Sequence, residues 1–88
     1  MNILWVPEAW EDYLHWQQTD PKILEKINIL TKNIRQTPFK GVGKPEPLKG
    51  PLSGWWSRRI TEEHRLVYRV VGKPGEQVLE IDQCRYHY

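Results

Sequence analysis

The chain of 88 residues contains a single cysteine, Cys84, which excludes an internal disulfide and any fold that depends on a disulfide framework. Long hydrophobic runs are also missing, since no segment approaches the roughly 20 apolar residues of a membrane-spanning helix. Residues 1–8 include no basic leader. We therefore expect no targeting signal, no membrane association and a cytoplasmic location.

Metal-ligand motifs are equally scarce. The chain has one Cys and three scattered His, and their spacings are not those of zinc sites. The segment Gly41-Val42-Gly43-Lys44 is glycine-rich, but it lacks the spacing of a phosphate-binding loop. We therefore expect neither a metal ion nor a bound cofactor.

Length and composition indicate one small folded domain, residues 1–88. The hydrophobic content of 39% and the charged content of 27% are typical of a folded chain rather than a disordered one. So short a chain buries a limited fraction of its surface, which makes a large enclosed cavity improbable. A shallow cleft that a large substrate covers would suit it better.

Positive charge gathers in the second half of the chain. Residues 1–39 hold four Lys or Arg and five Asp or Glu, a net of −1, whereas residues 40–88 hold nine and six, a net of +3. From Lys40 to Arg59 there are five cations and one acid, Glu46. The net positive charge of residues 40–88 would attract an anionic partner. The alternative is an ordinary solvated basic surface.

Hydrophobic periodicity predicts an α+β fold. Apolar residues recur at helical spacing after Pro7 and after Pro21, and Asp20 is a suitable N-cap for the second helix. The expected elements are a strand at 2–6, helices at 7–18 and 21–35, and strands at 55–60, 66–71 and 78–85. We expect two N-terminal helices packed on one face of a twisted, mostly antiparallel four-stranded sheet.

The segment 37–51 holds four Pro and three Gly and is predicted to be a loop. The prolines restrict the backbone, so the loop can hold a side chain in place. Loops of this length are often functional, and the alternative is a plain linker between the helices and the strands.

Glu46 and His87 have the chemistry for RNA cleavage without a metal. That reaction needs a base for the ribose 2′-hydroxyl, an acid for the leaving 5′-oxygen and a cation for the charge that develops on the phosphate. Glu46 lies in the loop between Lys44 and Lys49, and the alternative is a surface glutamate paired with a neighbouring lysine. His87 lies in the final residues, which often fray.

Five arginines could supply the cation: Arg58, Arg59, Arg65, Arg69 and Arg85. Strand alternation directs Arg65 and Arg69 away from the helices if Leu66, Tyr68 and Val70 face them. We expect an open sheet face bearing Arg59 and Arg65, with Arg69 as a further candidate, that binds a phosphate backbone. The alternative is an ordinary solvated sheet face.

Of the other histidines, His15 is expected to be structural or exposed, and His64 to be a turn residue.

Three segments together resemble the YoeB branch of the RelE toxin superfamily. They are Gly43-Lys44-Pro45-Glu46-Pro47-Leu48-Lys49, Ser57-Arg58-Arg59-Ile60-Thr61-Glu62-Glu63-His64-Arg65-Leu66-Val67-Tyr68 and the C-terminal Cys84-Arg85-Tyr86-His87-Tyr88. The similarity covers nearly the whole chain. The sequence differs from the pattern of this family at three places: the turn at 71–76, Gly50-Pro51 and Trp55-Trp56. These differences bear on the choice of partner more than on the chemistry.

The resemblance implies a RelE-like fold and a type II toxin that cleaves mRNA in the ribosomal A site. It implies that Glu46 is the general base, that His87 is the general acid and that Arg65 stabilises the transition state. Lys49 and Arg59 would support phosphate binding, and Tyr88 would position the RNA. The implied partners are mRNA, the bacterial ribosome, a YefM-like antitoxin and a second copy of the chain.

Two other functions are compatible with the sequence. One is a non-catalytic module that binds RNA or the ribosome through basic residues and blocks translation. The other is a protein-interaction domain that uses the aromatic residues. Loss of cleavage on removing Glu46 or His87 separates the enzyme from both, because a binding module would instead depend on its Lys and Arg.

Overall fold

Two prolines mark the starts of the two helices in the computed structural model, which describes residues 1–88. Helix α1 spans Pro7–Thr19 and helix α2 spans Pro21–Gln36, so both predicted helices are confirmed. The Asp20 carboxylate accepts the backbone N–H groups of Lys22 and Ile23 at 3.1 and 3.2 Å, as an N-cap does. Neither helix has the length and hydropathy that crossing a membrane requires.

The strands form one mixed sheet. Strands β1 (Asn2–Trp5), β2 (Glu46–Pro47), β3 (Trp56–Arg59), β4 (Arg65–Val71) and β5 (Val78–Gln83) lie in the order β1-β5-β4-β3-β2. Only β1 and β5 pair in parallel. The predicted α+β class with mostly antiparallel strands is confirmed. The sheet has five strands rather than four because two residues of the proline-rich loop pair with β3, and so short a strand has no detectable periodicity.

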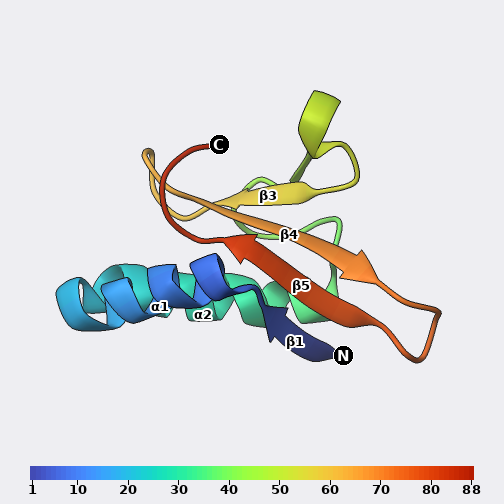
Figure 1. Cartoon of the computed structure of the whole chain (residues 1–88), viewed down its shortest axis with the longest axis horizontal. Helices are drawn as coiled ribbons and strands as arrows, with labels where there is room; N and C mark the ends of the chain where they lie inside the picture. The colour runs from blue at the N-terminus through green and yellow to red at the C-terminus, as the bar shows by residue number, and fades with distance from the viewer.

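The core lies between the helices and the sheet (Figure 1). Both helices cover the same face, as expected, with their apolar stripes turned towards β4 and β5. The core cluster contains 11 buried residues: Ala9, Trp16, Ile27, Leu30, Ile34, Ile60, Leu66, Tyr68, Leu79, Ile81 and Cys84. Burial of large apolar side chains on this scale is the main favourable contribution to folding.

A bulge in β5 changes which face its last residues point to. Val67 pairs with Gln83, but the next residue, Tyr68, pairs with Ile81, so Asp82 is an extra residue on β5. Leu79 and Ile81 face the helices before the bulge. After it, the alternation reverses, and Cys84 rather than Gln83 enters the core.

Candidate active site

The sheet face opposite the helices carries the candidate residues. Its cross-strand pairs follow from the register: Glu46 of β2 lies opposite Ser57 of β3, and Ser57 lies opposite Val67 of β4. Two residues further along β3, Arg59 lies opposite Arg65 of β4. Because residues directly opposite have side chains on the same face, Glu46, Arg59 and Arg65 share this face, as alternation predicted for the two arginines.

Arg65 is not displayed on an open face, which corrects the prediction. The residue is only 7% exposed. Its Nη1 donates to the backbone carbonyls of Thr61, Glu62 and His64 at 2.7, 3.1 and 3.1 Å. The turn before β4 therefore wraps the guanidinium, which strand alternation alone cannot reveal. Nε and Nη2 make no hydrogen bond to the protein, so one edge of the group is free to meet an anion.

Arg58 points to the other side of β3 and organises the loop that carries Glu46. It is completely buried. Its guanidinium donates to Asn33 Oδ1 at 2.6 Å and to Tyr68 Oη at 3.2 Å. It also donates to loop carbonyls of Thr37, Pro38, Lys40 and Val42 at 2.8 to 3.4 Å. Of the five candidate cations, Arg58 is thus excluded from binding RNA.

The loop is fixed in place by these contacts and by its glycines. Tyr68 Oη donates to the Pro38 carbonyl at 2.5 Å, and burial raises the pKa of Tyr68, which keeps it a neutral donor. At Gly41, with φ +125°, an added Cβ would lie 2.1 Å from Asn33 Oδ1. The expectation of a stiffened loop is therefore supported by packing as well as by proline.

The loop presents Glu46 and Lys49 to solvent. Both residues are exposed, and Lys49 directly precedes a 3-10 helix at Gly50–Leu52. The one salt bridge in the protein joins Arg69 to Glu80, so Glu46 is not paired with Lys44 or Lys49. This finding argues against the alternative in which Glu46 is a surface partner for a neighbouring lysine.

The C-terminal residues fold back onto the sheet rather than fraying. The backbone N–H of Arg65 donates to the Tyr86 carbonyl at 2.9 Å. The hydroxyls of Tyr88 and Ser57 are 3.2 Å apart. Ser57 is the residue opposite Glu46, so Tyr88 lies at the same part of the face as Glu46. The ring of His87 is exposed and lies 4.9 Å from the Tyr88 ring, in an edge arrangement.

The two remaining arginines are engaged within the protein. Arg69 shares the site face, but it donates to Glu80 at 2.5 Å and lies over the Trp55 ring at 4.4 Å. Arg85 lies over the ring of Tyr86 at 4.5 Å. The cations that stay available on the site face are Arg59, which is exposed, and the free edge of Arg65.

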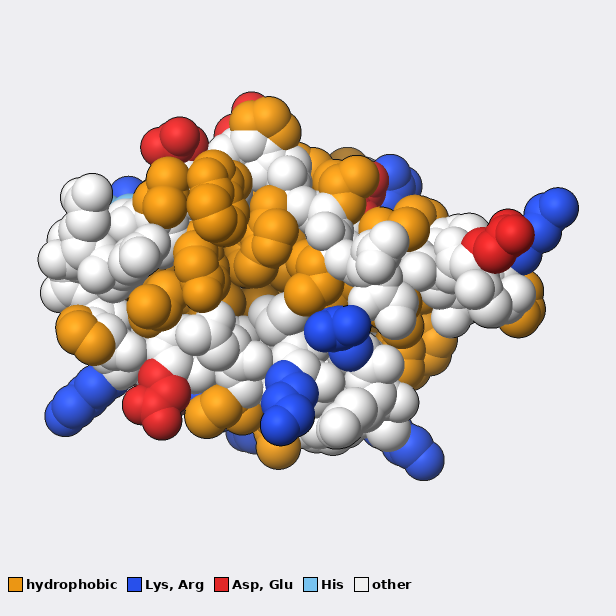
Figure 2. All heavy atoms as spheres, turned by 90° about the horizontal axis from the view of Figure 1, so that it is seen from below, with side chains coloured by type: hydrophobic (Ala, Val, Ile, Leu, Met, Phe, Trp, Pro, Cys, Tyr) orange, Lys and Arg blue, Asp and Glu red, His pale blue; other side chains and the backbone are white.

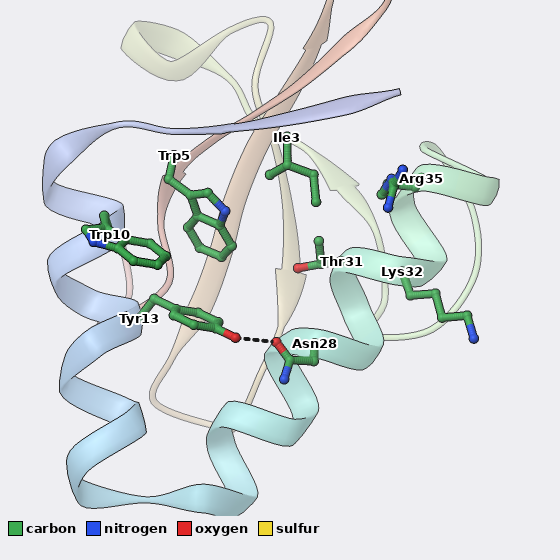
Figure 3. A pocket seen from close by; sticks show the side chains of 8 residues that line it. All are labelled: Ile3, Trp5, Trp10, Tyr13, Asn28, Thr31, Lys32 and Arg35. Carbon is green, nitrogen blue, oxygen red and sulfur yellow. Dashed lines mark hydrogen bonds between the residues drawn. The ribbon is translucent and has the colours of Figure 1, made fainter.

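The largest surface hollow lies away from these residues, between β1, α1 and α2 (Figure 3). It has a volume of about 520 Å³ and is lined by Ile3, Trp5, Trp10, Tyr13, Asn28, Thr31, Lys32 and Arg35. Figure 2 shows apolar side chains gathered on this side of the molecule. The lining includes no His, Asp or Glu, so the hollow offers no acid–base pair, and the site face is the better candidate for catalysis.

Cys84 is not an alternative nucleophile. Its thiol is buried, and desolvation together with nearby Asp12 raises its pKa to about 12. Reactive cysteines have the opposite property, because the thiolate is the nucleophile.

Three residues that matter for this face were not identified from the sequence. Ser57 contacts Tyr88, Tyr68 fixes the loop, and His64 accepts a hydrogen bond from the tail. Alternation gave the side of the strand for Ser57 and Tyr68, but no sequence signal identifies partners 30 or 31 residues away.

Comparison with known proteins gives a consistent family. A model of the YoeB-like toxins of bacterial type II toxin–antitoxin systems matches residues 5–88. Toxin YoeB of Escherichia coli strain K12 is 60% identical over 88 residues, which cover 100% of both chains. The structure of a YoeB/ParE toxin from Agrobacterium tumefaciens is 57% identical, covers 100% of both chains and has a TM-score of 0.96.

Two solved structures from Staphylococcus aureus are assemblies. A YoeB dimer is 47% identical with a TM-score of 0.89, covering 100% of this chain and 98% of that one. A heterotetrameric YoeB–YefM toxin–antitoxin complex is 47% identical with a TM-score of 0.88 and the same coverage.

Proposed function

Because this chain belongs to the family of YoeB-like toxins of bacterial type II toxin–antitoxin systems, we propose that it is a cytoplasmic, metal-independent endoribonuclease. Its proposed substrate is mRNA in the A site of the ribosome, and its effect is to stop translation. The observation that carries this proposal is the meeting of Glu46, Arg59, Arg65 and the C-terminal tail on one sheet face.

The proposed reaction is an attack of the ribose 2′-oxygen on the adjacent phosphorus. Glu46 accepts the proton of the 2′-hydroxyl, and the 2′-oxygen forms a bond to phosphorus. The bond from phosphorus to the 5′-oxygen breaks, and His87 donates a proton to that oxygen. The products are a cyclic phosphate, which can open to a 3′-phosphate, and a 5′-hydroxyl. General acid–base catalysis of this kind typically contributes about 10²–10⁴-fold per group.

Arg65 is suited to stabilise the charge that develops on the phosphate. Three carbonyls hold its Nη1, so the guanidinium keeps a fixed orientation without a carboxylate that would neutralise it. A preorganised cation of this kind needs no reorganisation as charge develops. Arg59 and Lys49 would add phosphate contacts, and Tyr88 would support the RNA at the end of the tail.

The openness of the face argues for a large substrate. Glu46, Lys49, Arg59 and His87 are all exposed, and none of them lines a pocket. A free oligonucleotide would find few groups to hold it there, whereas the ribosome can present mRNA and exclude water from the other side. We therefore propose weak activity on naked RNA.

We also propose two protein partners, a YefM-like antitoxin and a second copy of this chain. The support is the pair of Staphylococcus aureus relatives, one a dimer and the other a complex with YefM. Both have the same fold as this chain over its whole length.

The test is primer extension on translating bacterial ribosomes, in a buffer that contains Mg²⁺ for the ribosomes and no transition-metal ion. Wild type is compared with Glu46→Ala and His87→Ala, and Glu76→Ala, an exposed glutamate of the 71–76 turn, is the matched control. We expect cuts near the A-site codon for wild type and control, and a loss of about 10²-fold or more for the other two. Ribosome binding without cuts by wild type would instead support a non-catalytic translation inhibitor.

A further inference from the structure

The residue before His87 has an unusual backbone conformation. Tyr86 has φ +65°, in the left-handed region that L-residues with a side chain adopt rarely. Such a conformation persists only when the surrounding structure imposes it, and it is often found at functional sites. The direction in which His87 and Tyr88 leave the sheet depends on it.

Two adjacent residues hold both backbone polar groups of Tyr86. Its N–H donates to His64 Nδ1 at 2.7 Å. Its carbonyl accepts the N–H of Arg65 at 2.9 Å. An imidazole nitrogen accepts only when it is unprotonated, so this bond requires His64 to be neutral with its proton on Nε2.

The ring of His64 is itself fixed by the helix layer. It meets Trp16 edge to face, with ring centroids 4.7 Å apart. Trp16 in turn donates its indole N–H to the Cys84 carbonyl at 2.8 Å, where the tail begins. The His64 carbonyl accepts from Arg65 Nη1. His64 therefore connects the tail, the helix layer and the Arg65 guanidinium.

We propose that His64 is a positioning residue, which acts through the backbone of Tyr86 to hold His87 and Tyr88 against the site face. The inference rests on the proposed function in so far as His87 is the general acid. His64 itself touches no reacting group. Its contribution is the acceptor atom Nδ1, and neither its bulk nor its charge is required.

Two amide substitutions separate the acceptor from the rest of the side chain. In His64→Asn the amide oxygen can take the place of Nδ1, whereas in His64→Gln it lies one bond further out, near the place of Nε2. His64→Phe keeps a ring against Trp16 and removes every acceptor. His15 is the matched control, because its ring also meets Trp16 at 4.7 Å and makes no side-chain hydrogen bond.

The measurements are single-turnover cleavage of ribosome-bound mRNA and hydrogen exchange of the Tyr86 amide, on the full chain. For His64→Gln and His64→Phe we expect exchange about tenfold faster or more. We also expect a cleavage rate about 10²-fold lower at saturating ribosomes, with half-saturation unchanged, because misplacing a catalytic group affects the chemical step. His64→Asn and His15→Phe should stay near wild type in both measurements.

Wild-type cleavage rates in both His64→Gln and His64→Phe would overturn the proposal, as would an equal loss in His64→Asn and His64→Gln. If His64→Phe fails to fold, the comparison of Asn with Gln still decides. If the wild type itself does not cleave, the proposed function fails, but Tyr86 exchange still tests whether His64 holds the tail.

Discussion

Replacing Arg58 should cost more stability than any other single change to a charged residue of this protein. Its guanidinium makes six hydrogen bonds, to Asn33, Tyr68 and four loop carbonyls. In Arg58→Ala these acceptors, one buried and the others part-buried, lose their donor, and a cavity replaces the side chain. Each hydrogen bond to a charged group is worth about 1.5–3 kcal/mol, but bonds that share one group are not additive. We therefore expect a total loss of about 3–5 kcal/mol, which is among the largest effects of single substitutions.

That loss is a large part of the roughly 5–15 kcal/mol that holds a typical domain together. The assays are urea unfolding followed by Trp fluorescence and a thermal melt, in which the melting temperature of a chain of this size should fall by roughly 12–40 °C. Arg59→Ala is the matched control, because Arg59 is the next residue, is exposed and should change stability by less than about 0.5 kcal/mol. Equal destabilisation by the two substitutions would refute the assignment of Arg58 as the organiser of the loop.

Three further outcomes follow from buried or linking groups. Cys84 should react with a thiol reagent far more slowly in the native protein than in urea, because its pKa of about 12 leaves almost no thiolate; equal rates would contradict its burial. Burial raises the pKa of Asp12, so its ionisation opposes folding as the pH rises through the folded-state pKa. In a thermal melt at pH 7, Asp12→Asn should therefore match or exceed the stability of wild type. The difference in stability between the two proteins should vanish below pH 3.8. A double-mutant cycle of Ser57→Ala with Tyr88→Phe should give a coupling of about 0.5–1.5 kcal/mol in urea unfolding, and strict additivity would mean that the tail is not bonded to β3.

The helices and the four longer strands, β1, β3, β4 and β5, could be predicted because their apolar residues repeat along the chain. A helical stripe or an alternating strand is a property of neighbouring residues, and Asp20-Pro21 adds a local start signal. Strand β2 has two residues and no repeat, so its pairing with β3 could not be predicted. The sheet consequently has one more strand than the sequence indicated.

For the candidate site, the sequence indicated which residues have suitable chemistry but not how they are held. Alternation predicted correctly that Arg59 and Arg65 share a face. It could not predict that the 61–64 turn wraps Arg65, because that depends on three backbone carbonyls and on no side-chain pattern. The hydrogen bonds that hold Arg58 could not be predicted either. The next residue, Arg59, has the same side chain but points to the opposite side of the strand.

The position of His87 depends on a further step that no periodicity contains. Counting alternation through β5 from Leu79 and Ile81 would send Gln83 into the core and Cys84 to the site face. The extra residue at Asp82 reverses this order, so that Cys84 is buried and anchors the tail on the helix side. The tail then begins in the core, passes Trp16 and His64, and turns at Tyr86. The bulge and the left-handed residue together bring Tyr88 to the face that carries Glu46, so the candidate site depends on two departures from regular strand geometry.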